Sequence, residues 1–172
     1  MIRYLNGDAT VPQAKGPKII AHICNTLGGW GKGFVLSVSK RWPGPEKYYR
    51  AWHHAREIPT TLREGSLVLS SGDFGLGQVL LVQVLPDTFV LNMIAQEGMR
   101  TGSKGPPIRY DALAACLRTG DQLAMDMKSY RDVPASLHMP RIGTGLAGGK
   151  WERIEPLLAK LKSDVYVYDY DG

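Results

Sequence analysis

The chain has 172 residues, 44% of them hydrophobic, and carries a formal net charge of +5 at pH 7. This length suits one domain over residues 1–172, because a second hydrophobic core would be cramped, and no segment approaches the roughly 20 apolar residues that span a bilayer. The positive charge favours anionic partners such as phosphates or nucleotides, but the Lys and Arg residues are scattered, which argues against a nucleic-acid-binding stripe.

Strands and helices alternate along most of the chain. Short apolar or β-branched runs predict strands over residues 1–5, 18–24, 66–71, 78–85, 89–95, 136–142 and 165–170. Apolar residues at helical spacing predict helices over residues 34–42, 48–52, 112–127 and 154–161. Pro43 should end the first helix, whereas Pro106 and Pro107 precede the third, which has Asp111 in its first turn.

The order of these elements predicts an α/β sandwich with a mixed sheet, since strands and helices are interleaved. Three of the strands follow one another between residues 66 and 95 without a helix. That run implies antiparallel hairpins, with DFGLGQ and LPDTF as their turns. The rest of the sheet can be parallel because helices connect its strands.

The stretch HICNTLGGWGKGF, residues 22–34, leaves a predicted strand through a glycine-rich turn and enters a predicted helix. It brings His22, Cys24 and Asn25 to the end of the strand and keeps Trp30 among the glycines. Glycines let a backbone approach a ligand closely, and the N–H groups of a helix start favour an anion. The alternative is a turn that needs glycine only to reverse the chain.

A second glycine loop, PRIGTGLAGGKW, also joins a predicted strand to a predicted helix. Gly143, Gly145 and Gly148 have the spacing G-x-G-x-x-G, which is typical of a loop that holds a pyrophosphate. A Rossmann dinucleotide site would need several further strands, and only one follows. In an open α/β sheet, two such loops after neighbouring parallel strands share one crevice. We therefore expect these two loops to clamp one ligand.

Four segments together resemble a known family. LNGDAT near the start, AHICNTLGGWGKGF, NMIAQ followed by PPIRYDAL, and MPRIGTGLAGGKW resemble the macrodomains, which are ADP-ribose-binding modules. The chain is most similar to the branch of ADP-ribose 1″-phosphate phosphatases and more distantly to the terminal ADP-ribose protein glycohydrolases. This resemblance covers almost the whole chain and implies a three-layer α/β/α sandwich with a central mixed sheet.

The resemblance also implies a set of site residues. Asp8 would accept a hydrogen bond from the adenine amino group, main-chain N–H groups of residues 143–146 would bind the diphosphate, and residues 31–33 would face the distal ribose. His22 and Asn25 would be catalytic at the reactive end of that sugar, with Trp30 covering it. The full set implied for ADP-ribose is Asp8, Ala9, Asn25, Trp30, Gly31, Lys32, Gly33, Arg141, Ile142, Gly143, Thr144, Gly145 and Leu146.

Two positions depart from the glycohydrolase branch. Ala147 stands where that branch has an aspartate, and Gln96 stands where it has a lysine, with Lys104 too far along to take its place. Lysine-dependent chemistry on protein-linked ADP-ribose is therefore not expected. The phosphatase-like interpretation keeps His22 and Asn25.

Each candidate has a structural alternative. His22 at the end of an apolar strand can be a half-buried structural residue, and Asn25 can bond the backbone of its own turn. Cys24 lacks the arginine six positions later that a cysteine-phosphatase loop needs, and we interpret it as a small strand residue. Arg141 either anchors the second glycine loop by an ion pair or is merely solvated.

The function predicted from the sequence is binding of ADP-ribose with hydrolysis of a group from its distal ribose, as an ADP-ribose 1″-phosphate phosphatase. Alternatives are an ADP-ribosyl-protein hydrolase, an O-acetyl-ADP-ribose deacetylase, and a non-catalytic reader of ADP-ribose or ADP-ribosylated protein. A nucleic-acid-binding module driven by the net charge is disfavoured. No cofactor and no metal are expected, because the histidines have no metal-ligand spacing.

The compartment and assembly are expectations too. Polar residues begin by the sixth position, so we expect no signal peptide. The two cysteines, Cys24 and Cys116, are expected to be thiols of a cytoplasmic or nucleocytoplasmic protein. We expect a monomer without membrane contact.

Overall fold

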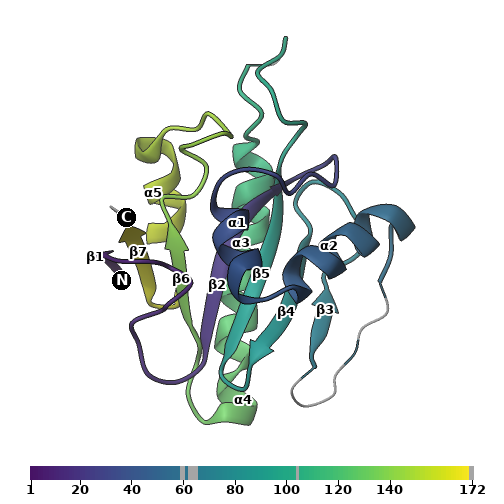
Figure 1. Ribbon diagram of the computed structural model, residues 1–172. Helices are drawn as coiled ribbons and strands as arrows, with labels where there is room; N and C mark the ends of the chain where they lie inside the picture. The colour runs from purple at the N-terminus through teal and green to yellow at the C-terminus, as the bar shows by residue number, and fades with distance from the viewer. Residues whose placement is uncertain (59–60, 62–65, 104, 171–172) are drawn as a thin grey trace.

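The computed structural model describes residues 1–58, 61, 66–103 and 105–170 (Figure 1). Its strands are β1 (Ile2–Asn6), β2 (Lys18–Asn25), β3 (Val68–Ser70), β4 (Val79–Leu85), β5 (Thr88–Gln96), β6 (Ser136–Pro140) and β7 (Val165–Asp169). Its helices are α1 (Phe34–Arg41), α2 (Gly44–Ala55), α3 (Tyr110–Asp126), α4 (Lys128–Arg131) and α5 (Trp151–Ala159). Every strand and helix predicted from the sequence is present, and their order is confirmed.

The strands form one mixed sheet in the order β1-β7-β6-β2-β5-β4-β3. Neighbours from β1 through β5 in this order are parallel, whereas β4 is antiparallel to β5 and β3 is antiparallel to β4. This division follows from the connections, since tight turns allow only antiparallel pairing and helical crossovers allow parallel pairing. The hairpins predicted between residues 66 and 95 are therefore confirmed.

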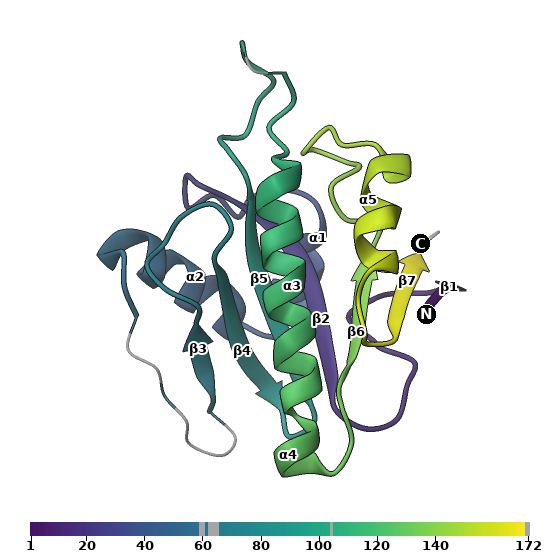
Figure 2. The ribbon, with the colours of Figure 1, turned by 180° about the vertical axis from the view of Figure 1, so that it is seen from behind.

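Helices cover both faces of the sheet, which makes three layers. Helices α1 and α2 lie in front of the sheet in Figure 1, and α3, α4 and α5 lie behind it, where Figure 2 shows them facing the viewer. The strand β5 is buried along its whole length, and β2 has only one residue that is not buried. Burial on two faces explains why these strands read as continuous apolar runs rather than as alternation.

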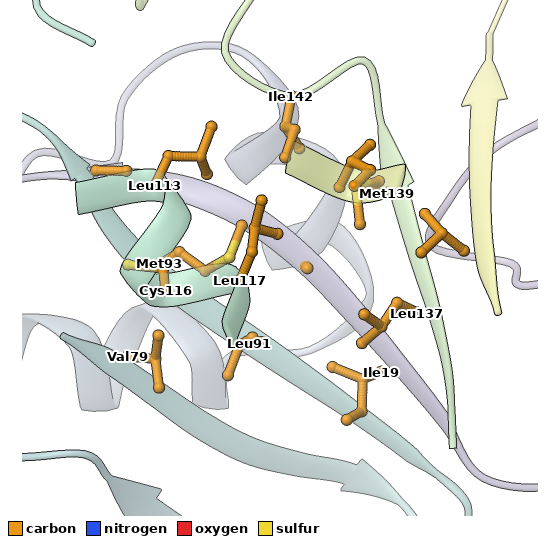
Figure 3. Packing of buried hydrophobic residues seen from close by; sticks show 14 of the residues in the cluster. Ile19, Val79, Leu91, Met93, Leu113, Cys116, Leu117, Leu137, Met139 and Ile142 are labelled. Atoms are coloured by element: carbon orange, nitrogen blue, oxygen red, sulfur yellow. The ribbon is translucent and has the colours of Figure 1, made fainter. Parts of the chain in front are cut away.

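Two hydrophobic clusters hold the layers together. The larger lies between the sheet and α3 and α5, and Figure 3 shows Leu113, Cys116 and Leu117 of α3 pointing at side chains of the sheet such as Leu91 and Met93. The smaller lies between the sheet and α1 and α2. A buried Leu or Met side chain contributes about 1.5–3 kcal/mol through removal from water, so the two clusters fix the sheet between its helices.

The two largest differences from the sequence prediction concern α2 and α4. The helix α2 begins at Gly44, four residues before the predicted start, because apolar spacing marks only its buried face and Pro45 suits a first helical turn. The helix α4 has four residues, too few to produce a periodic pattern. None of the described helices is both long and apolar enough to cross a membrane.

The large cluster generates a stability prediction. Leu117 is 2% exposed, whereas Leu36 on α1 is 53% exposed. We expect Leu117→Ala to lower the free energy of unfolding by about 2–5 kcal/mol, because it leaves a cavity under α3. The matched control Leu36→Ala should change it by less than about 0.5 kcal/mol. Urea unfolding of the two variants measures the difference, and equal effects would contradict the packing in Figure 3.

Candidate functional site

Parallel strands bring the two glycine loops to one edge of the sheet. Because β2 pairs in parallel with both β6 and β5, the β2–α1 loop and the β6–α5 loop follow the carboxyl ends of adjacent strands. Both lie at the upper edge in Figure 1. A Cβ atom placed on Gly33 would lie 3.7 Å from Cδ1 of Leu146, so the loops meet there. This edge is where open α/β sheets bind ligands.

The β6–α5 loop offers unpaired backbone donors. The amide N–H groups of Gly145, Leu146 and Ala147 donate to no acceptor among the described residues. Gly149 closes the loop by donating its N–H to the carbonyl oxygen of Gly143 at 2.6 Å. At Gly143 φ is 76°, and a Cβ atom there would lie 2.7 Å from Ile108, so only glycine fits. Free amides on a rigid loop form an anion-binding cradle.

The β2–α1 loop provides a second set of donors. The N–H groups of residues 30–35 have no acceptor within the described part of the chain. Gly33 precedes α1 with no side-chain cap, and the first turn of α1 contains no acidic residue. An uncapped helix start carries a partial positive charge. Lys32 is exposed here, and a Cβ atom on Gly31 would meet nothing within 4 Å, which leaves space beside this backbone.

His22 lies under the loop rather than in the crevice. It is 2% exposed, and the rings of Trp30 and Phe34 pack on it at centroid distances of 5.3 and 5.8 Å. Asn92 donates its Nδ2–H to the carbonyl of Pro45, so its Oδ1 accepts a hydrogen bond from Nε2 of His22 at 2.5 Å. Burial lowers the pKa of His22 to about 4, and the ring is neutral at pH 7.

The direct catalytic role expected of His22 stays a prediction, and the geometry gives it no free ring nitrogen at the crevice. Its Nε2 is committed to Asn92, and its Nδ1 is buried and has no hydrogen-bond partner among the described residues. A general base must reach the proton that it removes, directly or through one water. The half-buried structural role, which the sequence left open, fits this geometry better.

Asn25 makes three side-chain hydrogen bonds within its own turn. Its Oδ1 accepts the N–H groups of Leu27 and Gly29, at 2.9 and 3.1 Å, and its Nδ2 donates to the carbonyl of Gly29. The hydroxyl of Tyr49 donates to the Asn25 carbonyl oxygen at 2.5 Å. The predicted catalytic and ribose-binding role of Asn25 stays a prediction, because its oxygen serves the turn while Nδ2 uses only one of its two N–H groups there.

Trp30 and Cys24 are core residues. Trp30 is 4% exposed, packs against Tyr49 at 5.4 Å and donates its Nε1–H to Ser39. The expectation that it covers the distal sugar stays a prediction, and in this structure the ring is packed in the core. Burial raises the pKa of the Cys24 thiol well above its usual value, which agrees with its interpretation as a small strand residue.

Asp8 lies after β1 at the same edge. Its Oδ1 accepts hydrogen bonds from the backbone N–H and the hydroxyl of Thr10, at 2.8 and 2.7 Å. Its Oδ2 lies 3.8 Å from a terminal nitrogen of Arg41, and Ala9 beside it is buried. Arg41 belongs to α1 and was missed, because 33 positions separate it from Asp8 in a sequence that gives no sign of the contact.

Arg141 anchors the second loop, as one of its two predicted roles required. Its guanidinium pairs with Asp169 at 2.7 Å and lies over the rings of Tyr4 and Trp151. Ile142 is 3% exposed, within the larger cluster, and its N–H donates to the carbonyl of Pro140. The predicted ligand contact of Ile142 stays a prediction; in this structure its side chain is in the core and its amide bonds Pro140.

Thr144 and Ala147 lie in the β6–α5 loop, and Gln96 lies at the end of β5. Thr144 donates its hydroxyl to the Arg141 carbonyl, and Ala147 is 5% exposed. Gln96 at the end of β5 donates its amide to the Gly98 carbonyl, and Glu97 pairs with Arg109 at 3.0 Å. In the part of the chain that the structure describes, no cluster of three His, Cys, Asp or Glu residues could hold a metal ion.

Comparison with known proteins identifies the family. A macrodomain protein from Streptomyces coelicolor is 47% identical, with 98% of this chain and 99% of that chain covered and a TM-score of 0.74. The chain belongs to the macrodomain family. A protein of unknown function from Bacteroides thetaiotaomicron is 44% identical, with 98% of each chain covered and a TM-score of 0.80. No protein-family profile matches, so the assignment rests on these pairwise similarities.

Two further relatives bear on what macrodomains do. An ADP-ribose 1″-phosphate phosphatase from Lodderomyces elongisporus is 26% identical over 98% of this chain and 99% of its own length. A macrodomain from Trypanosoma brucei, solved in complex with ADP-ribose, is 17% identical, covers 97% of this chain and 63% of that chain, and has a TM-score of 0.52. The second likeness concerns the fold alone.

Burial of His22 generates a pH prediction. Above pH 6.5 the ring is neutral in the folded and unfolded states and adds no pH dependence. Between pH 6.5 and about 4 the unfolded ring binds a proton that the buried ring does not. The free energy of unfolding should therefore decrease as the pH is lowered from 6.5 to about 4, and His22 should contribute about 3 kcal/mol to this decrease.

The variant His22→Gln tests this, because its amide nitrogen can still donate to Asn92 but cannot titrate. Its free energy of unfolding, from urea titrations at pH 7.5 and 4.5, should fall less than that of the wild-type macrodomain. As an internal control, the free energy of unfolding should change by the same amount in the two proteins between pH 8 and pH 7, where His22 does not titrate. Parallel pH profiles for the two proteins would show that His22 is not held neutral by burial.

Proposed function

We propose that this macrodomain binds ADP-ribose across the two glycine loops. The observation that carries the proposal is the meeting of two amide-lined loops where Gly33 and Leu146 approach each other. A diphosphate placed there would accept hydrogen bonds from both loops and would lie at the start of α1, which favours negative charge. Similarity to an ADP-ribose 1″-phosphate phosphatase supports this ligand.

Asp8 is assigned to the adenine end. One oxygen of its carboxylate is committed to Thr10, and the other lies 3.8 Å from Arg41 and accepts no hydrogen bond from the described residues. Such an oxygen can accept a hydrogen bond from the exocyclic amino group of adenine. Charge-assisted hydrogen bonds of this kind contribute about 1.5–3 kcal/mol, so base recognition should depend on this one group.

The proposed reaction is hydrolysis of the phosphate ester on the distal ribose. Water attacks phosphorus, the bond from phosphorus to the sugar oxygen breaks, and the products are ADP-ribose and inorganic phosphate. Phosphoryl transfer needs positioning and charge stabilisation more than covalent help from the protein. The unpaired amides of the two loops and Lys32 can supply that stabilisation, so the buried position of His22 does not exclude the reaction.

A second candidate function is a reader of ADP-ribose that does not turn it over. The observation that favours it is the commitment of both expected catalytic side chains, His22 to Asn92 and Asn25 to its own turn. The two functions share the whole pocket. Incubation with ADP-ribose 1″-phosphate, O-acetyl-ADP-ribose and ADP-ribosylated protein, with product followed by chromatography, separates them.

Ligand binding is tested by calorimetric titration. ADP-ribose should bind in the micromolar range, about −8 kcal/mol, and tighter than AMP or NAD. Asp8→Asn should weaken it about tenfold, whereas Asp73→Asn in an exposed turn should not. The inosine analogue lacks the amino group and should bind the wild-type protein and Asp8→Asn alike. If Asp8→Asn weakens both ligands equally, the adenine role of Asp8 is wrong.

Turnover is tested with a matched pair of lysines. Lys32→Gln in the β2–α1 loop should lower kcat/KM for release of phosphate from ADP-ribose 1″-phosphate by about tenfold, since it removes a positive charge beside the transition state. Lys40→Gln, eight positions further on in α1, should leave it within about twofold. If the wild-type protein releases no phosphate from ADP-ribose 1″-phosphate but binds ADP-ribose in the calorimetric titration, the reader function is favoured instead.

A further inference from the structure

A cavity of about 450 Å³ lies where α3 and α5 begin, next to the β6–α5 loop. We call it the basic groove and define it by Pro106, Arg109, Tyr110, Gly148, Lys150 and Arg153. None of these residues belongs to the set assigned to ADP-ribose. The groove borders the loop at Gly148, where Pro106 packs so closely that a Cβ atom on the glycine would lie 2.7 Å away.

The charged lining is unbalanced. Arg109, Lys150 and Arg153 face the cavity, and Asp111 is the one acidic residue among those that line it. Arg109 pairs with Glu97, but Lys150 and Arg153 make no ion pair with any residue that the structure describes. Two positive side chains thus share a small concave surface without a partner.

Arg153 is held in place despite its exposure. Its guanidinium lies 3.9 Å from the centroid of the Tyr110 ring, a contact that holds a cation without neutralising it. The hydroxyl of the same tyrosine accepts the backbone N–H of Lys150 at 3.0 Å. Tyr110 therefore ties the start of α5 to the start of α3 and presents Arg153 at the groove.

The helix starts add to the positive potential. Arg109 and Lys150 occupy the positions before α3 and α5, neither helix has a side-chain cap, and each first turn contains one acidic residue, Asp111 in α3 and Glu152 in α5. Residues of this charge are disfavoured at helix starts, where Asp, Ser, Thr and Asn are preferred. The N–H groups of residues 110–112 and 151–152 donate to no acceptor within the described residues. These amides and the side chains of Lys150 and Arg153 can bind an anion, with Asp111 and Glu152 as the acidic residues beside them.

We infer that the basic groove binds the phosphate group of a small molecule. A tetrahedral dianion offers three terminal oxygens, which suits a guanidinium fork, an ammonium group and helix amides approaching from different directions. The ligand is either inorganic phosphate or a phosphomonoester, which share this chemistry. The inference stands apart from ADP-ribose binding, because it uses different residues.

Site-resolved titration tests it. Inorganic phosphate and glycerol 3-phosphate are added separately to the ¹⁵N-labelled full chain saturated with ADP-ribose, and backbone amide shifts are followed. The amides of residues 110–112 and 151–152 should shift and saturate with at least one of the two, and the tighter of the two identifies the source of the phosphate. Shifts confined to residues 143–147 would overturn the inference and would leave the ADP-ribose proposal unaffected.

Matched double variants complete the test. Lys150→Gln with Arg153→Gln should weaken phosphate binding at least tenfold, whereas Lys160→Gln with Lys162→Gln, which removes the same charge at the other end of α5, should change it less than about twofold. Circular dichroism confirms that both fold. If both double variants weaken phosphate binding equally, the effect comes from net charge and the inference is overturned. If the amides of the groove shift only when an oligonucleotide is added, the groove is a nucleic-acid contact and the inference is also overturned.

Discussion

Parallel pairing of β2 with both β5 and β6 is the constraint on which the site depends. It places the β2–α1 loop and the β6–α5 loop side by side at the carboxyl edge of the sheet, with α1 and α5 beginning just beyond them. Their backbone N–H groups then point to a shared region without any side chain having to be charged. Amides held on strand ends lose little freedom when a ligand binds, which is why they suit recognition of a diphosphate.

Polar side chains below the loops make this arrangement rigid. His22 bonds Asn92, Asn92 bonds the backbone at the start of α2, and Asn25 ties its own turn to Tyr49. Buried hydrogen bonds of this kind hold a loop in one position, although Nδ1 of His22 has no partner among the described residues. The residues that look most chemical in the sequence therefore support the site from beneath, and the groups that would face a ligand are mainly backbone.

The distribution of positive charge gives this macrodomain two anion-favouring regions. Lys32 and the start of α1 serve the crevice, while Lys150 and Arg153 serve the basic groove on residues that the ADP-ribose site does not use. Lys32, Lys150 and Arg153 thus lie close to helix starts, although the Lys and Arg residues appear scattered along the chain. Reinforcement of this kind favours compact phosphates over an extended nucleic acid.

The sequence by itself determined the elements, their order, the hairpins and the two glycine loops, because apolar periodicity and glycine act over a few residues. Only the tertiary structure decided which side chains reach the crevice. Whether His22, Asn25 and Trp30 face a ligand or the core depends on what packs against them from α1 and α2, and whether Arg41 meets Asp8 depends on how α1 crosses the sheet edge. Such contacts join distant segments, and residue type carries no signal of them.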